Sequence, residues 1–169
     1  DHVSFDLHAG EILGITGLLG DGKDELVRGL FGDLAFTSGT IEKNGKVIKY
    51  NHPAKAKKAG IGLLPSNRKE NAIIKDLTVT ENMTIVTLDQ YKSGLSLSKA
   101  KENRKALEYK EKLNIKVDNL ANLITSLSGG NQQKVVLAKW LTAEPDIMIL
   151  SNPTQGVDVG AKNEIYGVI

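Results

Sequence analysis

The chain has 169 residues, of which 40% are hydrophobic and 25% are charged, as is usual for globular domains. Its net charge of +2 argues against a strongly polyanionic partner such as nucleic acid, and the lack of cysteine excludes disulfides and thiolate metal sites. No apolar run is long enough to span a bilayer, and the N-terminus lacks a signal pattern, so we expect any membrane connection to come through a partner.

Two short strands are predicted at the N-terminus. Val3–Leu7 alternates in strand fashion, His8–Gly10 forms a turn, and Glu11–Thr16 has the character of a short buried strand. The chain begins within this pattern, and it ends within a helical run, 161–169, that has no stop signal. We therefore expect a fragment of a longer protein.

A glycine-rich loop follows the second predicted strand. Residues 17–24 read Gly-Leu-Leu-Gly-Asp-Gly-Lys-Asp, which meets the pattern G-x-x-x-x-G-K-[ST] at every position but the last. Glycines let successive N–H groups wrap a phosphate, and Lys23 can reach the β- and γ-phosphates at the positive end of a helix over 25–31. The predicted nucleotide-binding residues are Gly17, Leu18, Leu19, Gly20, Asp21, Gly22, Lys23, Asp24 and Glu25.

Asp24 occupies the position where a hydroxyl normally ligates Mg²⁺. A carboxylate can bind the metal instead, so Asp24 is a candidate Mg²⁺ ligand. Without metal, two like charges about 4 Å apart repel by ~4 kcal/mol at an effective dielectric of about 20, whereas a helix N-terminus returns only ~0.3–1 kcal/mol. The alternative is that Asp24 and Glu25 only stabilise the first turn of the helix.

The next stretch combines a hairpin, a short helix and a strand. Asn44-Gly45 is a strong hairpin signal between strands at 40–43 and 46–49. Pro53 suits the first turn of a helix over 53–59. Ile61–Leu64 then has the character of a buried strand that ends at Pro65.

From Thr78 the chain becomes mainly helical. Ser98 is predicted to cap a helix over 99–113, whose interleaved lysines and glutamates indicate a solvated face rather than a nucleic-acid surface. A further helix is predicted over 131–142, before the continuous apolar strand Ile147–Leu150, which is of the fully buried type. Strands alternating with helices favour an α/β core with a largely parallel sheet.

Four motifs follow one another in the order 17–24, 66–68, 127–134 and 147–162. Residues 127–134, Leu-Ser-Gly-Gly-Asn-Gln-Gln-Lys, resemble the signature motif of ATP-binding cassette (ABC) ATPases. Together with Pro-Thr-Gln-Gly-Val-Asp-Val-Gly-Ala-Lys at 153–162, they are similar to the second, C-terminal cassette of tandem-cassette ATPases from bacterial simple-sugar importers of the ribose, galactose or xylose type. The likeness covers essentially the whole chain.

The resemblance implies a P-loop NTPase fold with a mostly parallel sheet, a small antiparallel β subdomain and a helical subdomain. Residues 1–77 would form the first part of the core, 78–126 the helical subdomain, and 127–169 the signature helix, a strand and the loop with Asp158. The core would be incomplete at both ends, because an adenine-stacking aromatic residue is expected before the chain and a switch histidine after it.

In ABC proteins, the signature of one cassette closes over ATP held by the phosphate loop of another. The resemblance therefore assigns trans ATP contact to Leu127, Ser128, Gly129, Gly130, Asn131, Gln132 and Gln133. A hydroxyl and two glycine N–H groups at a helix N-terminus also make a chemically suitable anion site. A plain serine cap would explain Ser128 but not the run that follows. Asp158 resembles the residue that communicates across the cassette pair.

The chain departs from the family at three places around the expected metal and water. The strand 147–150 should end in Asp-Glu, but Ser151 and Asn152 follow it, and neither can act as a general base near neutral pH. Ser66 and Asn67 stand before Arg68 in place of an acidic pair, and Asp24 is the third departure. General acid–base assistance contributes ~10²–10⁴-fold, so its loss predicts weak turnover at this site.

The sequence therefore predicts the ATP-binding cassette of a sugar-type importer, with ATP and Mg²⁺ as cofactors. The implied partners are a second cassette, expected in the same full-length chain, transmembrane permease subunits and, indirectly, an extracytoplasmic sugar-binding protein, with no nucleic acid. The implied location is the cytoplasmic face of the bacterial cell membrane, as a peripheral protein. Two alternatives are a non-hydrolysing regulatory nucleotide-binding module and a soluble ABC protein without a transporter.

Overall fold

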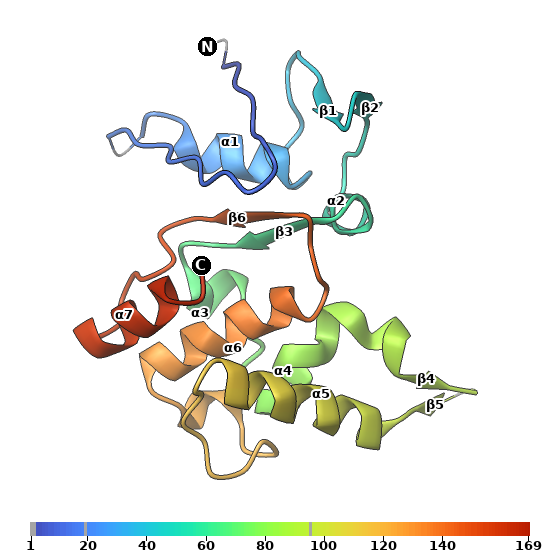
Figure 1. Ribbon diagram of the computed structural model, residues 1–169, viewed down its shortest axis with the longest axis vertical. Helices are drawn as coiled ribbons and strands as arrows, with labels where there is room; N and C mark the ends of the chain where they lie inside the picture. The colour runs from blue at the N-terminus through green and yellow to red at the C-terminus, as the bar shows by residue number, and fades with distance from the viewer. Residues whose placement is uncertain (1–2, 19, 95) are drawn as a thin grey trace.

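The computed structural model describes residues 3–18, 20–94 and 96–169 (Figure 1). Leu19, which belongs to the predicted phosphate loop, lies outside these residues. The elements are α1 (Lys23–Leu30), β1 (Ile41–Lys43), β2 (Lys46–Ile48), α2 (Pro53–Lys58), β3 (Ile61–Leu64), α3 (Arg68–Asn71), α4 (Val79–Thr84), η1 (Ile85–Tyr91), β4 (Lys92–Ser93), β5 (Ser96–Leu97), α5 (Lys99–Lys112), η2 (Ile124–Ser126), α6 (Gly129–Leu141), β6 (Ile147–Leu150) and α7 (Val159–Tyr166).

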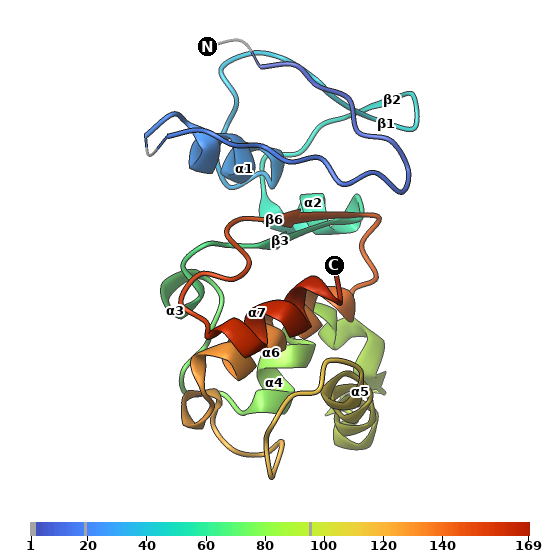
Figure 2. The same cartoon turned by 60° about the vertical axis from the view of Figure 1, so that its left-hand side comes forward.

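A parallel pair of strands, β3 and β6, lies at the centre of the molecule. Ile61 pairs with Ile147, and the register runs through to Leu64 and Leu150. In Figures 1 and 2, α1 lies above this pair and α4, α5 and α6 lie below it. The predicted α/β architecture with parallel strands is confirmed. Because the strands are parallel, the segments that follow them, with Ser66–Arg68 and Ser151–Asp158, leave from the same edge.

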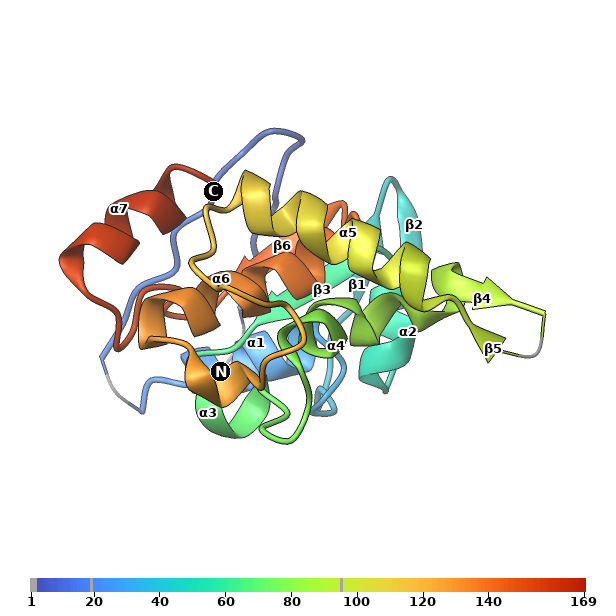
Figure 3. The same cartoon turned by 90° about the horizontal axis from the view of Figure 1, so that it is seen from below.

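Helix α6 is the centre of the helical layer (Figure 3). Its residues from Gln133 to Trp140 are all buried, so α6 has no continuous solvent face in its second half. Its Val135 and Val136 belong to one apolar cluster that also takes Met83 from α4 and Ala106 from α5. A second cluster joins β3 to the end of α1, where Phe31 packs edge-on against Trp140 at 5.3 Å between ring centroids.

The N-terminal strands predicted at 3–7 and 11–16 are wrong: none of the described residues before α1 belongs to a strand. The turn between them is confirmed, with Gly10 at φ 77° and the Glu11 N–H donating to the His8 carbonyl at 3.0 Å. The segment runs beside α1, away from β3 and β6 (Figure 1), and its Val3, Ile12 and Ile15 side chains are exposed. Alternation in sequence signals a preference for burial, but a strand also requires a neighbour to pair with.

The remaining elements follow the sequence closely. The β1–β2 hairpin turns at Asn44 and Gly45, both with positive φ, and Ser98 caps α5 as predicted. The strand β6 is present, but all of its residues are half-buried, so the expectation of complete burial is wrong. The antiparallel pair β4–β5, which extends from the helical layer in Figure 3, was not predicted.

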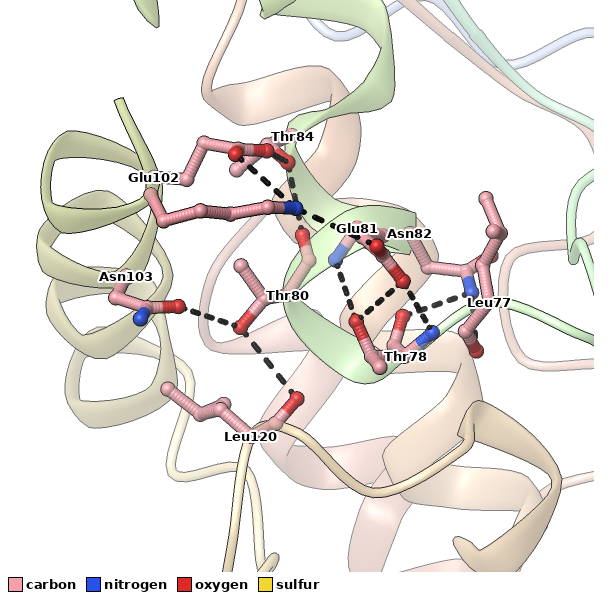
Figure 4. A network of polar contacts seen from close by, with 10 residues as sticks. Leu77, Thr78, Thr80, Glu81, Asn82, Thr84, Glu102, Asn103 and Leu120 are labelled. Atoms are coloured by element: carbon pink, nitrogen blue, oxygen red, sulfur yellow. Dashed lines mark hydrogen bonds and ion pairs between the residues drawn. The ribbon is translucent and has the colours of Figure 1, made fainter. Parts of the chain in front are cut away.

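Polar side chains order the start of the helical layer (Figure 4). Thr78 and Glu81 form a capping box at the N-terminus of α4, in which each side chain accepts a hydrogen bond from the other residue's backbone N–H. Glu102 of α5 is almost completely buried, and its Oε1 accepts a hydrogen bond from the Thr84 hydroxyl at 3.0 Å. These contacts fix α5 against α4.

Among the helices of the described residues, none combines the length and the apolar character needed to cross a membrane.

Lys139 of α6 is a buried cation in the helical layer. Its Nζ donates to the Ala72 carbonyl, which ties α6 to the segment after α3. Burial lowers the pKa of Lys139 from 10.5 to about 8, because the charged form is poorly solvated there. The unfolded chain therefore binds more protons than the folded chain between these two values.

We expect the free energy of unfolding to rise by about 3 kcal/mol between pH 8 and pH 10.5. Lys139 must release its proton when the chain folds in this range, and the free-energy cost of that release falls as the pH rises. Urea unfolding followed by Trp140 fluorescence measures this rise. Lys139→Met should remove it, and replacement of the exposed Lys101 by Met should leave it intact. An unchanged rise in Lys139→Met would contradict the assignment.

Candidate functional site

The loop before α1 has the backbone of a phosphate cradle. Gly20 and Gly22 adopt φ values of 89° and 88°, a left-handed conformation that favours glycine. The Lys23 ammonium donates to the Gly17 carbonyl and, at 3.0 Å, to the Leu18 carbonyl. The Asp21 carboxylate accepts the Leu18 N–H at 2.5 Å, so both charged side chains are bonded to backbone groups of the loop.

The described part of this loop fits a phosphate group. Helix α1 begins at Lys23, two residues earlier than predicted, and no side chain caps it, so its first N–H groups are free for an anion. The fit to Mg²⁺ is poorer. Asp24 is exposed in the first turn, and within the described ranges no three His, Cys, Asp or Glu side chains gather into a metal site. The role of Asp24 as a metal ligand stays a prediction.

The signature residues form the N-terminus of α6. The Ser128 hydroxyl caps the helix and accepts from the Asn131 side-chain amide at 3.0 Å. The Asn131 side-chain oxygen, Oδ1, accepts the Lys116 backbone N–H at 2.8 Å, and the Gln132 side-chain amide donates to the Leu127 backbone carbonyl at 3.0 Å. Gln133 donates to the Pro153 carbonyl at 2.7 Å. The polar side chains of this run therefore fix the loops around the helix start.

Both signature glycines lie where a side chain would collide. A Cβ on Gly129 would lie 2.6 Å from Arg68 Nη2, and a Cβ on Gly130 would lie 2.6 Å from the Ala161 Cβ of α7. Real Cβ atoms essentially never come this close to a neighbour. Glycine at both positions therefore permits the close packing of α6 on α7 and on the Arg68 side chain.

Arg68 joins three of the four predicted motifs. It is only 8% exposed, and its guanidinium donates to the Gln155 carbonyl at 2.8 Å and the Gly156 carbonyl at 3.2 Å. In Figure 2 the segment between β6 and α7 passes α3 on its way to the start of α7. Burial lowers the pKa of Arg68. The motifs at 66–68, 127–134 and 147–162 thus meet around one guanidinium.

The end of β6 carries no carboxylate. The Ser151 N–H donates to the Leu64 carbonyl at 2.9 Å and continues the strand ladder. Asn152 is exposed with φ 47°, a left-handed conformation that asparagine tolerates better than most residues, and its carbonyl accepts the Gln155 N–H. Hydroxyl and amide groups at these two positions can hydrogen-bond to water but cannot take its proton.

Asp158 is the N-cap of α7, and its side chain accepts the Ala161 N–H at 2.9 Å. This backbone hydrogen bond lowers the pKa of Asp158, so the carboxylate stays charged well into the acid range. Helix α7 is also tied to α6 by an ion pair between Lys134 and Glu164. Asp158 is therefore fixed relative to the signature helix.

A pocket of about 550 Å³ opens beside the start of α6. Its charged lining residues are Lys110, Lys116 and Asp118, and Ser128 and Asn131 of the signature also line it. Neither lysine was predicted as a site residue, because Lys110 belongs to a helix whose charges indicated only a solvated face. Chain folding alone brings these cations beside the signature, and no local pattern marks them in the sequence.

The chain is similar to known ATP-binding proteins over almost its whole length. The family described as "ABC transporter" matches residues 1–155. The ribose import ATP-binding protein RbsA of Clostridium perfringens (strain SM101) is 46% identical over 167 residues, which are 98% of this chain and 33% of that protein. RbsA 3 of Rhizobium meliloti (strain 1021) is 45% identical over 168 residues, 99% of this chain and 33% of that protein.

Among solved structures, the dimeric structure of MJ0796, a bacterial ABC transporter cassette, gives a TM-score of 0.78 at 22% identity and covers 97% of this chain and 70% of that chain. A post-hydrolysis dimer of MJ0796 bound to ADP and Pi gives 0.69 at 21% identity, over 87% of this chain and 62% of that chain. At these identities the likeness shows the fold. The chain spans about a third of the length of the curated relatives that it matches.

We expect Gly130→Ala to lower the free energy of unfolding by about 1–3 kcal/mol, because the new methyl group would overpack the contact with Ala161. Gly167→Ala is the matched control, since a Cβ there meets its nearest neighbour at 3.5 Å. Urea midpoints of the two variants provide the comparison. Equal midpoints would show that α7 is not packed on Gly130 as described.

Proposed function

The chain belongs to the ABC transporter family, and from this premise we propose that it is the second ATP-binding cassette of a sugar-type importer. It would couple ATP binding and hydrolysis to solute uptake. The printed names of the relatives, ribose import ATP-binding proteins, support the transport class. The run at 153–162 supports the second position within a tandem pair.

We infer that the site on this chain's own phosphate loop turns ATP over weakly or not at all. The nucleotide would be held by the N–H groups of the described loop and by Lys23. Ser151 and Asn152, at the end of β6, offer no group that can accept a proton from water at neutral pH. Bound Mg²⁺ supplies positive charge to the phosphates in this family's chemistry, and Asp24 would be its ligand from this loop.

We infer further that the signature completes the hydrolytic site of a partner cassette. The observation that carries this inference is the placement of the two motifs. The loop before α1 lies above the β3–β6 pair and the start of α6 lies below it (Figure 1). A nucleotide on this loop is therefore served by another cassette's signature, while Ser128 and the first N–H groups of α6 are left for the partner's nucleotide.

The pocket beside α6 supports the same inference. Lys110 and Lys116 outnumber the one carboxylate of the pocket, Asp118, so its charged side chains are net positive next to the helix N-terminus, and both features favour a polyphosphate. The partner cassette would lie in the same full-length chain. Permease subunits would hold the pair at the cytoplasmic face of the membrane, and an extracytoplasmic sugar-binding protein would act through them.

The lack of a carboxylate at Ser151 and Asn152, directly after β6, equally favours a second function, a regulatory module. In that case ATP bound here would only hold the cassette pair closed. Hydrolysis at the partner site would then depend on ATP bound at this loop.

We expect Ser128→Arg in the full-length protein to lower ATP hydrolysis by about 10²-fold or more, because the arginine would fill the anion position of the signature. Lys23→Ala should retain about half of the activity or more. Ser38→Arg, at an exposed position before β1, controls for the added charge. Steady-state phosphate release measures all three.

The reverse ranking, with Lys23→Ala inactive and Ser128→Arg active, would overturn the proposal that the signature serves the partner. Loss of activity in both variants would favour the regulatory module, because nucleotide at this loop would then be required for turnover elsewhere.

A further inference from the structure

Arg68 is the feature that the proposed function leaves unexplained. Arginine is seldom buried without a carboxylate partner, yet this side chain is 8% exposed. None of the ion pairs formed within residues 3–18, 20–94 and 96–169 involves it. Its Nε is also buried without a hydrogen-bond partner in the part of the chain described. A side chain needed only for packing could be apolar here, and would avoid both costs.

The contacts of Arg68 show what the charged group does instead. Its two terminal nitrogens donate to successive carbonyls, those of Gln155 and Gly156, in the fork geometry that only arginine provides. The Nη2 end of the same group lies against Gly129, the first residue of α6, where an added Cβ would lie 2.6 Å from it. The guanidinium therefore holds the loop that leads to Asp158 against the signature helix.

A second contact fixes the same loop. Gln133, one turn into α6, donates to the Pro153 carbonyl at 2.7 Å. The loop is thus held at Pro153 by α6 and at Gln155 and Gly156 by Arg68. Because Arg68 is the first residue of α3, in the segment that leads from β3 to the helical layer, displacement of that layer would be transmitted to the signature and to this loop together.

The charge of Arg68 also has a consequence for an anion at the signature. The N-terminus of α6 carries the positive end of the helix dipole, and Arg68 places a full positive charge beside the first residue of that helix. The two features repel each other in the free protein. A phosphate group at Ser128 would be attracted by both, so an anion there relieves an unfavourable arrangement.

We propose that Arg68 is a positioning residue for the site that the signature forms with ATP on the partner cassette. It holds Gln155 and Gly156 against Gly129. This contact positions the Ser128 hydroxyl and the first N–H groups of α6 for the terminal phosphate of that ATP. This inference rests on the proposed function. Arg68 acts through the signature and does not itself touch the nucleotide.

The test compares Arg68→Gln and Arg68→Lys in the full-length protein assembled with its permease. Arg68→Gln removes the charge and the fork, and we expect kcat to fall about 10²-fold, as for a misplaced reacting group, with a smaller rise in KM for ATP from the lost charge. Arg68→Lys keeps the charge without the fork and should lie between wild type and Arg68→Gln. Lys69→Gln, which removes the exposed neighbouring cation of α3, should behave as wild type.

Rates are expressed per ATP-binding site, titrated with a non-hydrolysable ATP analogue, so that loss of folded protein does not count as loss of turnover. A purely structural role predicts fewer sites with an unchanged kcat per site, and that result would overturn the proposal. A change confined to KM would also overturn it. If Arg68→Gln yields no folded protein, Arg68→Lys decides: an unchanged kcat per site contradicts the proposal, and a fall of about tenfold supports it.

Ser128→Arg, measured in parallel, distinguishes failure of the proposed function from failure of the inference about Arg68. If Ser128→Arg leaves hydrolysis intact, the proposed function fails and the role of Arg68 fails with it. If Ser128→Arg abolishes hydrolysis and Arg68→Gln matches Lys69→Gln, only the inference about Arg68 fails.

Discussion

The parallel pairing of β3 with β6 is the constraint on which the rest of the described structure depends. Four residues on each strand pair in register, and the segments that continue them emerge at one edge. That arrangement brings Arg68 within hydrogen-bond distance of Gln155 and Gly156, which are more than 80 residues away in sequence. The first turn of α6 packs into the same junction because Gly129 and Gly130 have no side chains. Strand pairing, a buried guanidinium and two glycines together make one rigid unit.

In the proposed function, the binding of nucleotide and its hydrolysis are assigned to different parts of the chain. The loop before α1 has the glycine conformations and the uncapped helix start that suit a phosphate, so it can hold a nucleotide without help from the end of β6. Ser151 and Asn152 keep the backbone of the strand end but lack a proton acceptor. We therefore propose that the chain binds ATP and presents a signature while contributing little turnover of its own. The charge of Arg68, the dipole of α6 and the lysines of the adjoining pocket all favour an anion at Ser128.

Much of this could be predicted from the sequence where local rules decide. Asn44-Gly45 indicated a hairpin, Ser98 indicated the start of α5, and the apolar runs at 61–64 and 147–150 indicated the paired strands. The helix expected from residue 131 begins two residues earlier, at Gly129. The prediction of strands at 3–7 and 11–16 was wrong, because alternation of apolar and polar residues indicates a face suited to burial but does not identify a strand to pair with. Lys110 and Lys116 were not predicted as site residues because only the folded chain places them beside the signature. The contacts of Arg68 could not be predicted because its partners are the backbone carbonyls of Gln155 and Gly156, and every residue type has a backbone carbonyl.

The most direct test of the account is the nucleotide content of the full-length protein during turnover. The protein is mixed with excess ATP and Mg²⁺, freed rapidly of unbound nucleotide, and denatured, and the released ADP and ATP are counted per polypeptide. The account predicts no more than one ADP per cassette pair, with the second site holding intact ATP or none. Two ADP per pair would mean that Ser151 and Asn152 do not disable this site, and the division of labour between the cassettes would be wrong.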